Sequence, residues 1–189
     1  MDSAGAFGST VGIVSLGAVG RLVCERLRPF GVTVLACDPC VSPTDAEKIG
    51  VTLVSLDEIF SRSDVVSIHT PRLPETEGMI TGALLNRLRP KSTLINTSRG
   101  AVIREDEMAE VPTRRSDLTA VLDVLQHEPP DPANPLLKLP NVMITPHIAG
   151  ALGSERLRLG RLMIEEFKRW QRGDLLQWQI TPEKSCLLA

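Results

Sequence analysis

Residues 11–20 read VGIVSLGAVG, an apolar run that passes directly into a glycine-containing turn. The turn matches the pattern G-x-G-x-x-G, with Ser15 in the first glycine position and with Gly17 and Gly20 in the other two. Apolar residues then recur at helical spacing over residues 19–27. A strand, a tight turn and a helix in this order are the context in which the pattern binds a dinucleotide.

The motif predicts a role for each of its backbone positions. Gly17 lets the backbone approach a pyrophosphate, and the N–H groups of Ala18 and Val19 point toward it from the start of the helix. Gly20 allows the helix to pack closely against the preceding strand. Ser15 strains the turn if its position requires a positive φ, because serine lacks the conformational freedom of glycine.

A candidate ribose-binding carboxylate closes the second apolar run. Asp38 stands close to the roughly 20-residue distance from the turn at which dinucleotide sites place this acid. No Arg occurs at positions 39–42 to bind a 2′-phosphate, so the sequence predicts NAD rather than NADP. The alternative interpretation is an ordinary turn between strand and helix, followed by a surface aspartate.

Apolar runs of strand length alternate with helical patterns along the chain. Most runs lack period-2 alternation, which is typical of strands covered on both faces. The runs span residues 11–16, 32–38, 51–54, 65–70, 93–98, 119–125 and 142–145. Repeated β-α-β units predict an α/β fold, a Rossmann-type doubly wound parallel sheet with helices on both faces. In such sheets ligands bind beyond the carboxyl ends of the strands.

Local signals predict two helix boundaries. Ser55 followed by Glu58 forms a capping box for a short helix that reaches Phe60. A second helix should start near Glu105 and end or kink before Pro112, because proline lacks the amide that a helix interior requires.

Composition places the chain among globular proteins and argues against several partners. Its 189 residues suit one domain, and 42% hydrophobic and 23% charged residues match the usual average. Lys and Arg number 21 against 23 Asp and Glu, with no basic tract, so we expect no nucleic-acid partner. The absence of Tyr excludes chemistry with a tyrosine general acid. Without a long apolar stretch or a basic N-terminal segment, we expect no membrane partner and a cytoplasmic protein.

The cysteines leave open a redox interpretation. Cys24, Cys37, Cys40 and Cys186 are too few for a disulfide scaffold, but the middle two form a C-x-x-C motif. A redox pair would open a helix, whereas the next helix is expected only from about Asp45. One such motif cannot supply four zinc ligands, so we expect no metal site. Incidental cysteines are the alternative to thiol exchange.

Polar and ionisable residues follow four further runs. They are His69-Thr70-Pro71, Asn96-Thr97-Ser98-Arg99-Gly100, Asp123 with Glu128, and Thr145-Pro146-His147. At one sheet edge, His147 would act as general acid and base while Glu128 raises its pKa and holds its tautomer. Arg99 would bind a planar carboxylate with two hydrogen bonds. The alternatives are unrelated surface charges and, for His69, a packed histidine at a strand end.

Five stretches together resemble the D-isomer-specific 2-hydroxyacid dehydrogenase family. They comprise residues 12–20; residues 69–71 with 74–76; residues 96–100; residues 122–124 with Glu128-Pro129; and residues 139–142 with 145–150. They follow one another in the family order and cover about residues 9–172. Five motifs in order make the resemblance specific.

The resemblance implies both a reaction and a cofactor. Arg99, Glu128 and His147 would be catalytic: the His takes the proton of the 2-hydroxyl as hydride leaves for the nicotinamide, the Glu pairs with the His, and the Arg binds the substrate carboxylate. The cofactor would be NAD, the substrate a 2-hydroxy or 2-oxo acid, and the protein a homodimer through its NAD-binding domain. The residues expected to contact NAD are Gly17, Ala18, Val19, Gly20, Asp38, Thr70, Thr97, Ser98, Arg99, Asp123, His147 and Gly150.

Three features depart from the family pattern. Members carry a substrate domain built mostly before the nucleotide domain, whereas the first strand here begins at Val11. We therefore expect an NAD-binding domain over residues 9–172, ending in a helix from about residue 154, and a tail over residues 173–189 that would normally return to a substrate domain absent from this chain. Ser15 and the segment 111–115 are the other departures.

The resemblance leaves two functions open. One is an NAD-dependent 2-hydroxyacid oxidoreductase, and the other is an NAD(H)-sensing binding module similar to C-terminal binding protein corepressors. Fold analogy does not separate the two. The side chains that select the acid would lie mostly in the other domain.

Overall fold

The computed structural model describes residues 6–182 and divides the chain into two compact units. The first unit, Met1–Pro146, contains the sheet, and the second, His147–Ala189, contains one long helix.

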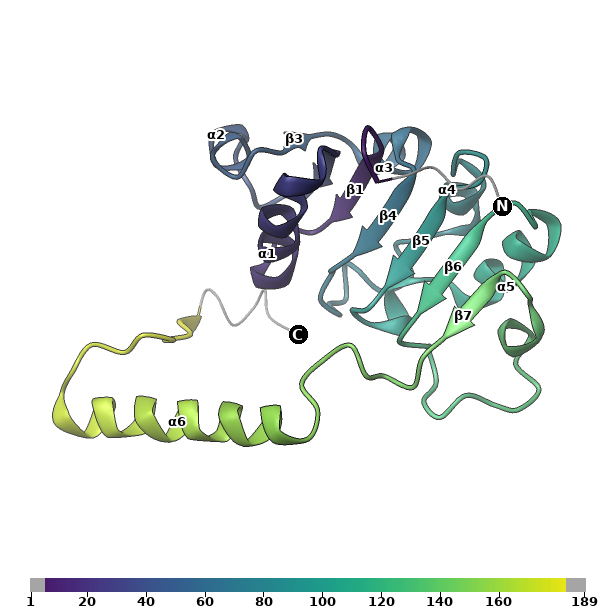
Figure 1. The fold of residues 1–189 in the computed structure, drawn as a ribbon. Helices are drawn as coiled ribbons and strands as arrows, with labels where there is room; N and C mark the ends of the chain where they lie inside the picture. Colours follow the sequence, from purple (N-terminus) through teal and green to yellow (C-terminus); the bar gives the residue numbers. More distant parts are fainter. Residues whose placement is uncertain (1–5, 183–189) are drawn as a thin grey trace. The chain divides into compact units, whose positions relative to one another are not determined.

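The first unit is built on a parallel sheet, and its described residues form strands in the order β3-β2-β1-β4-β5-β6-β7 (Figure 1). The strands are β1 Thr10–Val14, β2 Thr33–Cys37, β3 Thr52–Leu53, β4 Val65–Ile68, β5 Thr93–Asn96, β6 Thr119–Leu122 and β7 Val142–Ile144. Each predicted run coincides with one strand, which confirms the Rossmann-type fold. The strands end before the predicted runs do, because the last residues of each run already belong to the loop that follows.

The strand order reverses between β1 and β4. Val14, the last residue of β1, pairs with Cys37 of β2 on one side and with Ile68 of β4 on the other. The three strands therefore end level with one another. The residues that follow them meet at one edge of the sheet, which is the place where doubly wound sheets bind ligands.

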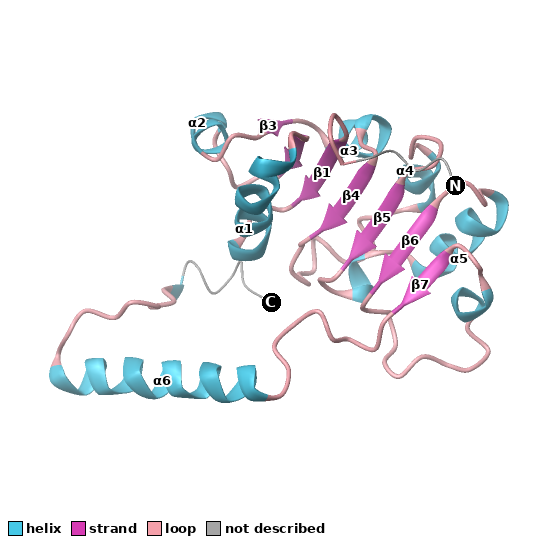
Figure 2. Cartoon of the chain, viewed as in Figure 1, coloured by secondary structure: helices cyan, strands magenta, loops and turns pink. Residues whose placement is uncertain are grey.

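Helices alternate with the strands along the chain (Figure 2). The helices are α1 Ala18–Leu27, α2 Pro43–Lys48, α3 Leu56–Arg62, α4 Gly82–Asn86, α5 Glu105–Arg114 and α6 Ser154–Arg172, with short 3-10 turns η1 Arg28–Phe30, η2 Gly100–Val102 and η3 Pro135–Lys138. The predicted capping box is present at α3: the Glu58 amide donates to Ser55 Oγ, and the Ser55 amide donates to the Glu58 carboxylate.

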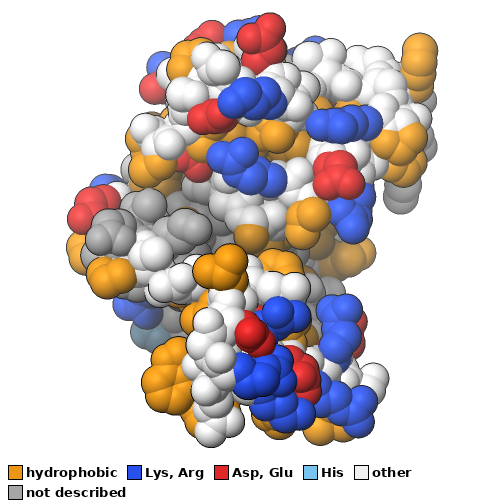
Figure 3. All heavy atoms as spheres, turned by 90° about the vertical axis from the view of Figure 1, so that its left-hand side faces the viewer, with side chains coloured by type: hydrophobic (Ala, Val, Ile, Leu, Met, Phe, Trp, Pro, Cys, Tyr) orange, Lys and Arg blue, Asp and Glu red, His pale blue; other side chains and the backbone are white. Residues whose placement is uncertain are grey.

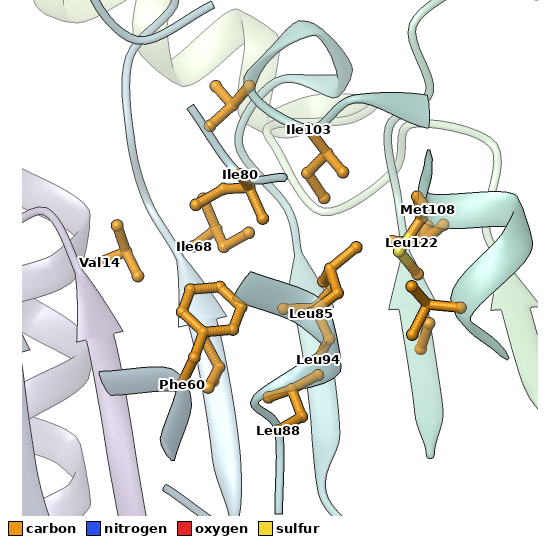
Figure 4. Packing of buried hydrophobic residues seen from close by; sticks show 14 of the residues in the cluster. Val14, Phe60, Ile68, Ile80, Leu85, Leu88, Leu94, Ile103, Met108 and Leu122 are labelled. Carbon is orange, nitrogen blue, oxygen red and sulfur yellow. The ribbon is translucent and has the colours of Figure 1, made fainter. Parts of the chain in front are cut away.

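Two apolar clusters show that helices cover both faces of the sheet. Neighbouring residues of a strand point to opposite faces, and Ile13 and Val14 of β1 are both buried. Ile13 packs in a cluster with Cys24 of α1 and Ala46 of α2. Val14 belongs to a second cluster, which contains Phe60 of α3 and side chains of α4 and α5 (Figure 4).

The structure corrects two predicted helix boundaries. Of the two predicted outcomes at Pro112, an end or a kink, the end is wrong, because helix α5 continues through the proline to Arg114. Pro112 lies in the last turn, where one missing amide interrupts little, and the Asn141 side chain donates a 3.1 Å hydrogen bond to its carbonyl. Helix α2 starts at Pro43 rather than near Asp45, because the Ser42 side chain caps it and proline is well suited to a first helical position.

The described part of the second unit consists of residues 147–153, helix α6 and the segment over residues 173–182. The helix ends at Arg172, and its C-cap residue Gly173 adopts a positive φ of 73°. The Glu166 carboxylate accepts hydrogen bonds of 2.9 Å from the amides of Gln177 and Trp178, so the segment after the helix is attached to it. Apolar and basic side chains both reach the surface of this unit, in the lowest part of Figure 3. Among the described residues, no helix is long and apolar enough to span a membrane.

Candidate functional site

The turn after β1 has the backbone that the dinucleotide motif predicts. Ser15 adopts a positive φ of 76°, so the position does require the conformation that glycine adopts most easily. A Cβ on Gly20 would lie 2.2 Å from the Ser15 carbonyl oxygen, which explains the glycine there. Gly17 precedes α1, and a Cβ placed on it would meet no atom within 4 Å. This open end of the helix presents amide groups of its first turn, including those of Ala18 and Val19, to an anion.

Asp38 connects this turn to the loop after β2. One carboxylate oxygen accepts a 2.7 Å hydrogen bond from the Leu16 amide, and the other accepts a 2.8 Å bond from the Cys40 amide. A carboxylate oxygen has two lone pairs, so each can also accept a ribose hydroxyl. The carboxylate is therefore held in place before any ligand arrives.

Thr70 lies at the end of β4, beside the turn. Its side chain is 1% exposed, and its Oγ1 lies 2.9 Å from Ser15 Oγ and 3.5 Å from the Val14 carbonyl oxygen. The two hydroxyls join the loops after β1 and β4. Sequence reasoning treated Ser15 as a departure and missed this partner.

A buried amide shapes the loop after β5. Asn96 is fully buried, and its Oδ1 accepts hydrogen bonds from the amide and the hydroxyl of Ser98, at 3.0 and 2.9 Å. Its Nδ2 donates to the Arg99 carbonyl at 3.1 Å. Thr97 and Arg99 are exposed on this loop, so both can reach a ligand beyond the sheet edge.

The loops after β5 and β6 touch at Gly100. A Cβ on Gly100 would lie 2.0 Å from the Leu125 carbonyl carbon and oxygen, so only glycine fits. The Leu125 amide in turn donates a 3.0 Å hydrogen bond to the Glu128 carboxylate. The backbone segment that carries Arg99 thus lies against the one that carries Glu128.

Asp123 is buried at the end of β6, with 3% of its surface exposed. Its carboxylate accepts a short hydrogen bond from the hydroxyl of Thr145, which follows β7. The interaction links the loops at this end of the sheet and places a carboxylate at the predicted edge.

Glu105, which sequence reasoning noted only as a helix start, holds the loop of Glu128. Its carboxylate accepts a 2.7 Å hydrogen bond from the Asn134 side chain and a second bond from the Gln126 amide. An acidic residue in the first turn of α5 was the available signal, but that position alone predicts only an interaction with the helix dipole.

His147 and Gly150 belong to the second unit. His147 is its first residue, is exposed, and adopts a positive φ of 51°. A Cβ on Gly150 would meet no atom within 4 Å. Their approach to Arg99 and Glu128 stays a prediction.

His69 matches the interpretation as a packed histidine. Its Nε2 lies 3.0 Å from Ser67 Oγ, and its side chain is half-buried. Burial lowers the pKa of the imidazole below its ordinary value. Burial of the His69 side chain thus favours its neutral form.

The cysteines do not have the environment of a redox pair. Cys24, Cys37 and Cys40 are free thiols, and Cys186 lies outside the described residues. Burial, with the adjacent Asp38 charge, raises the pKa of the Cys37 thiol, whereas thiol exchange benefits from a lowered one. Over residues 6–182, no three His, Cys, Asp or Glu side chains gather as a metal site would require.

Sequence comparisons identify relatives along most of the chain. The family model for the D-isomer specific 2-hydroxyacid dehydrogenase, NAD binding domain, matches residues 1–149. D-3-phosphoglycerate dehydrogenase of Archaeoglobus fulgidus is 39% identical over 166 residues, which cover 88% of this chain and 32% of that protein. Glyoxylate reductase of Korarchaeum cryptofilum is 35% identical over 169 residues, covering 89% of this chain and 51% of that one. The chain thus spans about a third of the first relative and about half of the second.

Solved structures agree with the sequence comparisons. D-mandelate dehydrogenase of Rhodotorula graminis, in its apo form, superposes with a TM-score of 0.82 at 27% identity, covering 93% of this chain and 52% of that one. D-lactate dehydrogenase of Lactobacillus jensenii, solved with NAD+, gives a TM-score of 0.78 at 25% identity, covering 92% and 56%. With the glycine turn and Asp38 at the sheet edge, the chain belongs to the D-isomer specific 2-hydroxyacid dehydrogenase family, as an NAD-binding domain.

Proposed function

We propose that this chain is the cofactor half of an oxidoreductase that interconverts 2-hydroxy and 2-oxo acids with NAD. One observation carries the proposal: the dinucleotide turn with Asp38 and the touching loops of Arg99 and Glu128 occupy the same edge of one sheet. Because the chain covers only part of its relatives, the activity belongs to the whole protein.

Different parts of NAD would bind to different loops along the edge of the sheet. The first turn of α1 would hold the pyrophosphate, and Asp38 would accept the hydroxyls of the adenosine ribose. The residues proposed to contact NAD are Gly17, Ala18, Val19, Gly20, Asp38, Thr70, Thr97, Ser98, Arg99, Asp123, His147 and Gly150. When bound, the nicotinamide supplies the acceptor or donor of the hydride.

Three side chains would do the chain's own part of the chemistry. As the 2-hydroxy acid is oxidised, His147 would take the proton of the 2-hydroxyl group, while the hydride would leave the carbon that bears this hydroxyl for the cofactor. Glu128 would pair with His147 and stabilise its cation. Arg99 would bind the substrate carboxylate through two hydrogen bonds and so orient the reacting carbon.

Domain limits, assembly and location belong to the proposal as well. Residues 9–172 would form the NAD-binding domain, and residues 173–189 would return to a substrate domain. The NAD-binding domain would form a homodimer in the whole protein. Free thiols in the described part of the chain support a reducing, cytoplasmic location.

No observation favours the corepressor-like alternative, since the relatives named above are a dehydrogenase and a reductase. The raised pKa of Cys37 likewise argues against thiol exchange. A steady-state assay still separates enzyme from sensor, because a sensor would bind NADH and turn over no acid.

The test combines calorimetry on this chain with turnover by the whole protein. We expect the chain to bind NADH and NAD far more tightly than NADP, because a 2′-phosphate would face the Asp38 carboxylate. Two like charges about 4 Å apart repel by roughly 4 kcal/mol at an effective dielectric of 20. Equal affinities for NAD and NADP, or NADH binding without turnover of any 2-oxo acid by the whole protein, would contradict the proposal.

A further inference from the structure

Ser15 occupies a backbone conformation that normally calls for glycine. Its φ of 76° lies in the left-handed region, and among the described residues only Lys91 and His147 share a positive φ without being glycine. A serine in this conformation costs free energy that a glycine would not. A favourable contact of the Ser15 side chain can offset this cost.

The Ser15 side chain supplies a hydrogen bond across the reversal point of the sheet. Its Oγ lies 2.9 Å from Oγ1 of Thr70, which follows β4, while its amide donates a 2.9 Å bond to the Cys37 carbonyl of β2. Ser15 thus bonds to β2 on one side and to the loop after β4 on the other. These strands lead into the two halves of the predicted dinucleotide site.

Because Thr70 is buried, loss of its hydrogen bond to Ser15 would be costly. Its side chain is 1% exposed, so water does not readily replace a lost partner. Thr70 Oγ1 has a single proton, and the Val14 carbonyl at 3.5 Å is a second neighbour that can accept it. When Thr70 donates its hydroxyl hydrogen bond to the Val14 carbonyl oxygen, Thr70 Oγ1 accepts a hydrogen bond from the Ser15 hydroxyl, and both hydroxyls are oriented.

We propose that Ser15 is a positioning residue for NAD: its hydrogen bond to Thr70 fixes the pyrophosphate-binding turn relative to the end of β4. The proposal rests on the NAD site described above. A ligand that contacts only the turn and Asp38 tolerates movement between the two loops, whereas a ligand that spans both loops does not. The pair should therefore matter more for the intact dinucleotide than for its ADP fragment.

Calorimetry on the full 189-residue chain tests this difference with NADH and with ADP. We expect Ser15→Ala and Thr70→Val each to weaken NADH binding by roughly 3- to 10-fold, the range of one hydrogen bond, and ADP binding by less than about twofold. The double variant should be no weaker than either single variant, because both remove the same bond. Thr70→Ser keeps the hydroxyl and should restore most of the NADH affinity.

Glycine substitutions separate the backbone from the hydroxyl. Ser15→Gly should melt at a higher temperature than Ser15→Ala, because glycine adopts the positive φ freely, yet bind NADH as weakly. Lys91→Gly is the matched control: it relieves a φ of 64° at the opposite end of the sheet and should leave the ratio of NADH to ADP affinity unchanged.

Several outcomes would overturn the proposal. Unchanged NADH affinity in Ser15→Ala, equal losses of NADH and ADP affinity, or additive effects of the two single substitutions would each show that the bond does not position the site. If Thr70→Val does not fold, Ser15→Ala and Thr70→Ser carry the comparison. A wild-type chain that does not bind NADH contradicts the NAD site itself, whereas a wild-type chain that binds NADH no better than its Ser15→Ala variant contradicts the positioning role alone.

Discussion

The Leu16 amide donates a 2.7 Å hydrogen bond to the carboxylate of Asp38, so the predicted ribose ligand also anchors the turn that would bind the pyrophosphate. The second carboxylate oxygen accepts from Cys40 in the loop after β2. Both oxygens are thus engaged with backbone amides in the absence of a nucleotide. Asp38 has a structural role in addition to its expected contact with the ribose.

This double role predicts that Asp38 variants lose stability together with cofactor affinity. Asp38→Ala leaves two amides without their charged acceptor, and we expect the free energy of unfolding to fall by about 1.5–3 kcal/mol. NADH affinity should fall as well, and the preference for NAD over NADP should narrow because the repelling charge is gone. Urea denaturation and calorimetry measure the two effects.

The control for Asp38 is another aspartate on the same unit. Asp57 is exposed and forms an ion pair with Arg87, so Asp57→Ala should change stability by less than about 1 kcal/mol and leave NADH affinity unchanged. An Asp38→Ala chain with full stability would show that the amide contacts contribute nothing.

In the whole enzyme, His147→Ala should lower turnover by roughly 10²- to 10⁴-fold and lower NADH affinity far less, because His147 is only one of the proposed NAD contacts. The proton transfer belongs to the chemical step, not to cofactor binding. Glu128→Gln should shift the pH-rate profile toward lower pH, since the imidazolium loses its anionic partner. Loss of NADH affinity with full turnover in His147→Ala would disprove the assignment.

An exchange of donor and acceptor tests how Glu105 holds the loop of Glu128. Glu105→Gln places an NH₂ group against one of the two N–H donors that the carboxylate now binds, the Asn134 side chain or the Gln126 amide. Asn134→Asp places its carboxylate against that of Glu105. Each change should lower the free energy of unfolding by about 1–2 kcal/mol. The double variant restores the pattern, because Gln at 105 donates to Asp at 134 and still accepts from the Gln126 amide.

Urea denaturation of the four proteins gives the coupling free energy between positions 105 and 134. We expect the double variant to recover most of the stability that the single variants lose. Purely additive losses would mean that the 2.7 Å contact between Glu105 and Asn134 does not stabilise the loop.

From the burial of His69 we predict that the free energy of unfolding falls on mild acidification. Burial lowers its pKa in the folded state, so near and below the unfolded pKa of roughly 6.5 the unfolded chain binds more protons than the folded one. The contribution of neutral His69 to the free energy of unfolding is complete above the unfolded pKa. It is lost as the pH falls through the folded pKa. The free energy of unfolding from pH 7.5 to 5.5 should fall more steeply for the wild type than for His69→Gln, and parallel profiles would contradict this origin.

The sequence predicted the sheet because its strands are continuous apolar runs between glycine- and proline-containing connections. The edge residues Asp38, Thr70 and Arg99 followed from the same pattern, since parallel strands all end at one side. Pro112 was misjudged because a local rule for helix interiors was applied to a last turn.

Side-chain pairs far apart in the sequence were beyond the reach of periodicity. Ser15 and Thr70 are 55 positions apart, and Glu105 and Asn134 are 29 apart. No local pattern relates the members of either pair. They become neighbours only when β1 pairs with β4 and when the loop after β6 packs on α5.

The contact at Gly100 couples the loop after β5 to the loop after β6, so that neither loop can change its position alone. A single methyl group at this position would displace the Leu125 backbone, and with it the amide that holds the Glu128 carboxylate. Any attempt to redesign substrate preference through the loop of Arg99 would therefore also move Glu128. Residues 97–100 and residues 125–128 should therefore be exchanged together, because replacing either loop alone would disturb the contact between them.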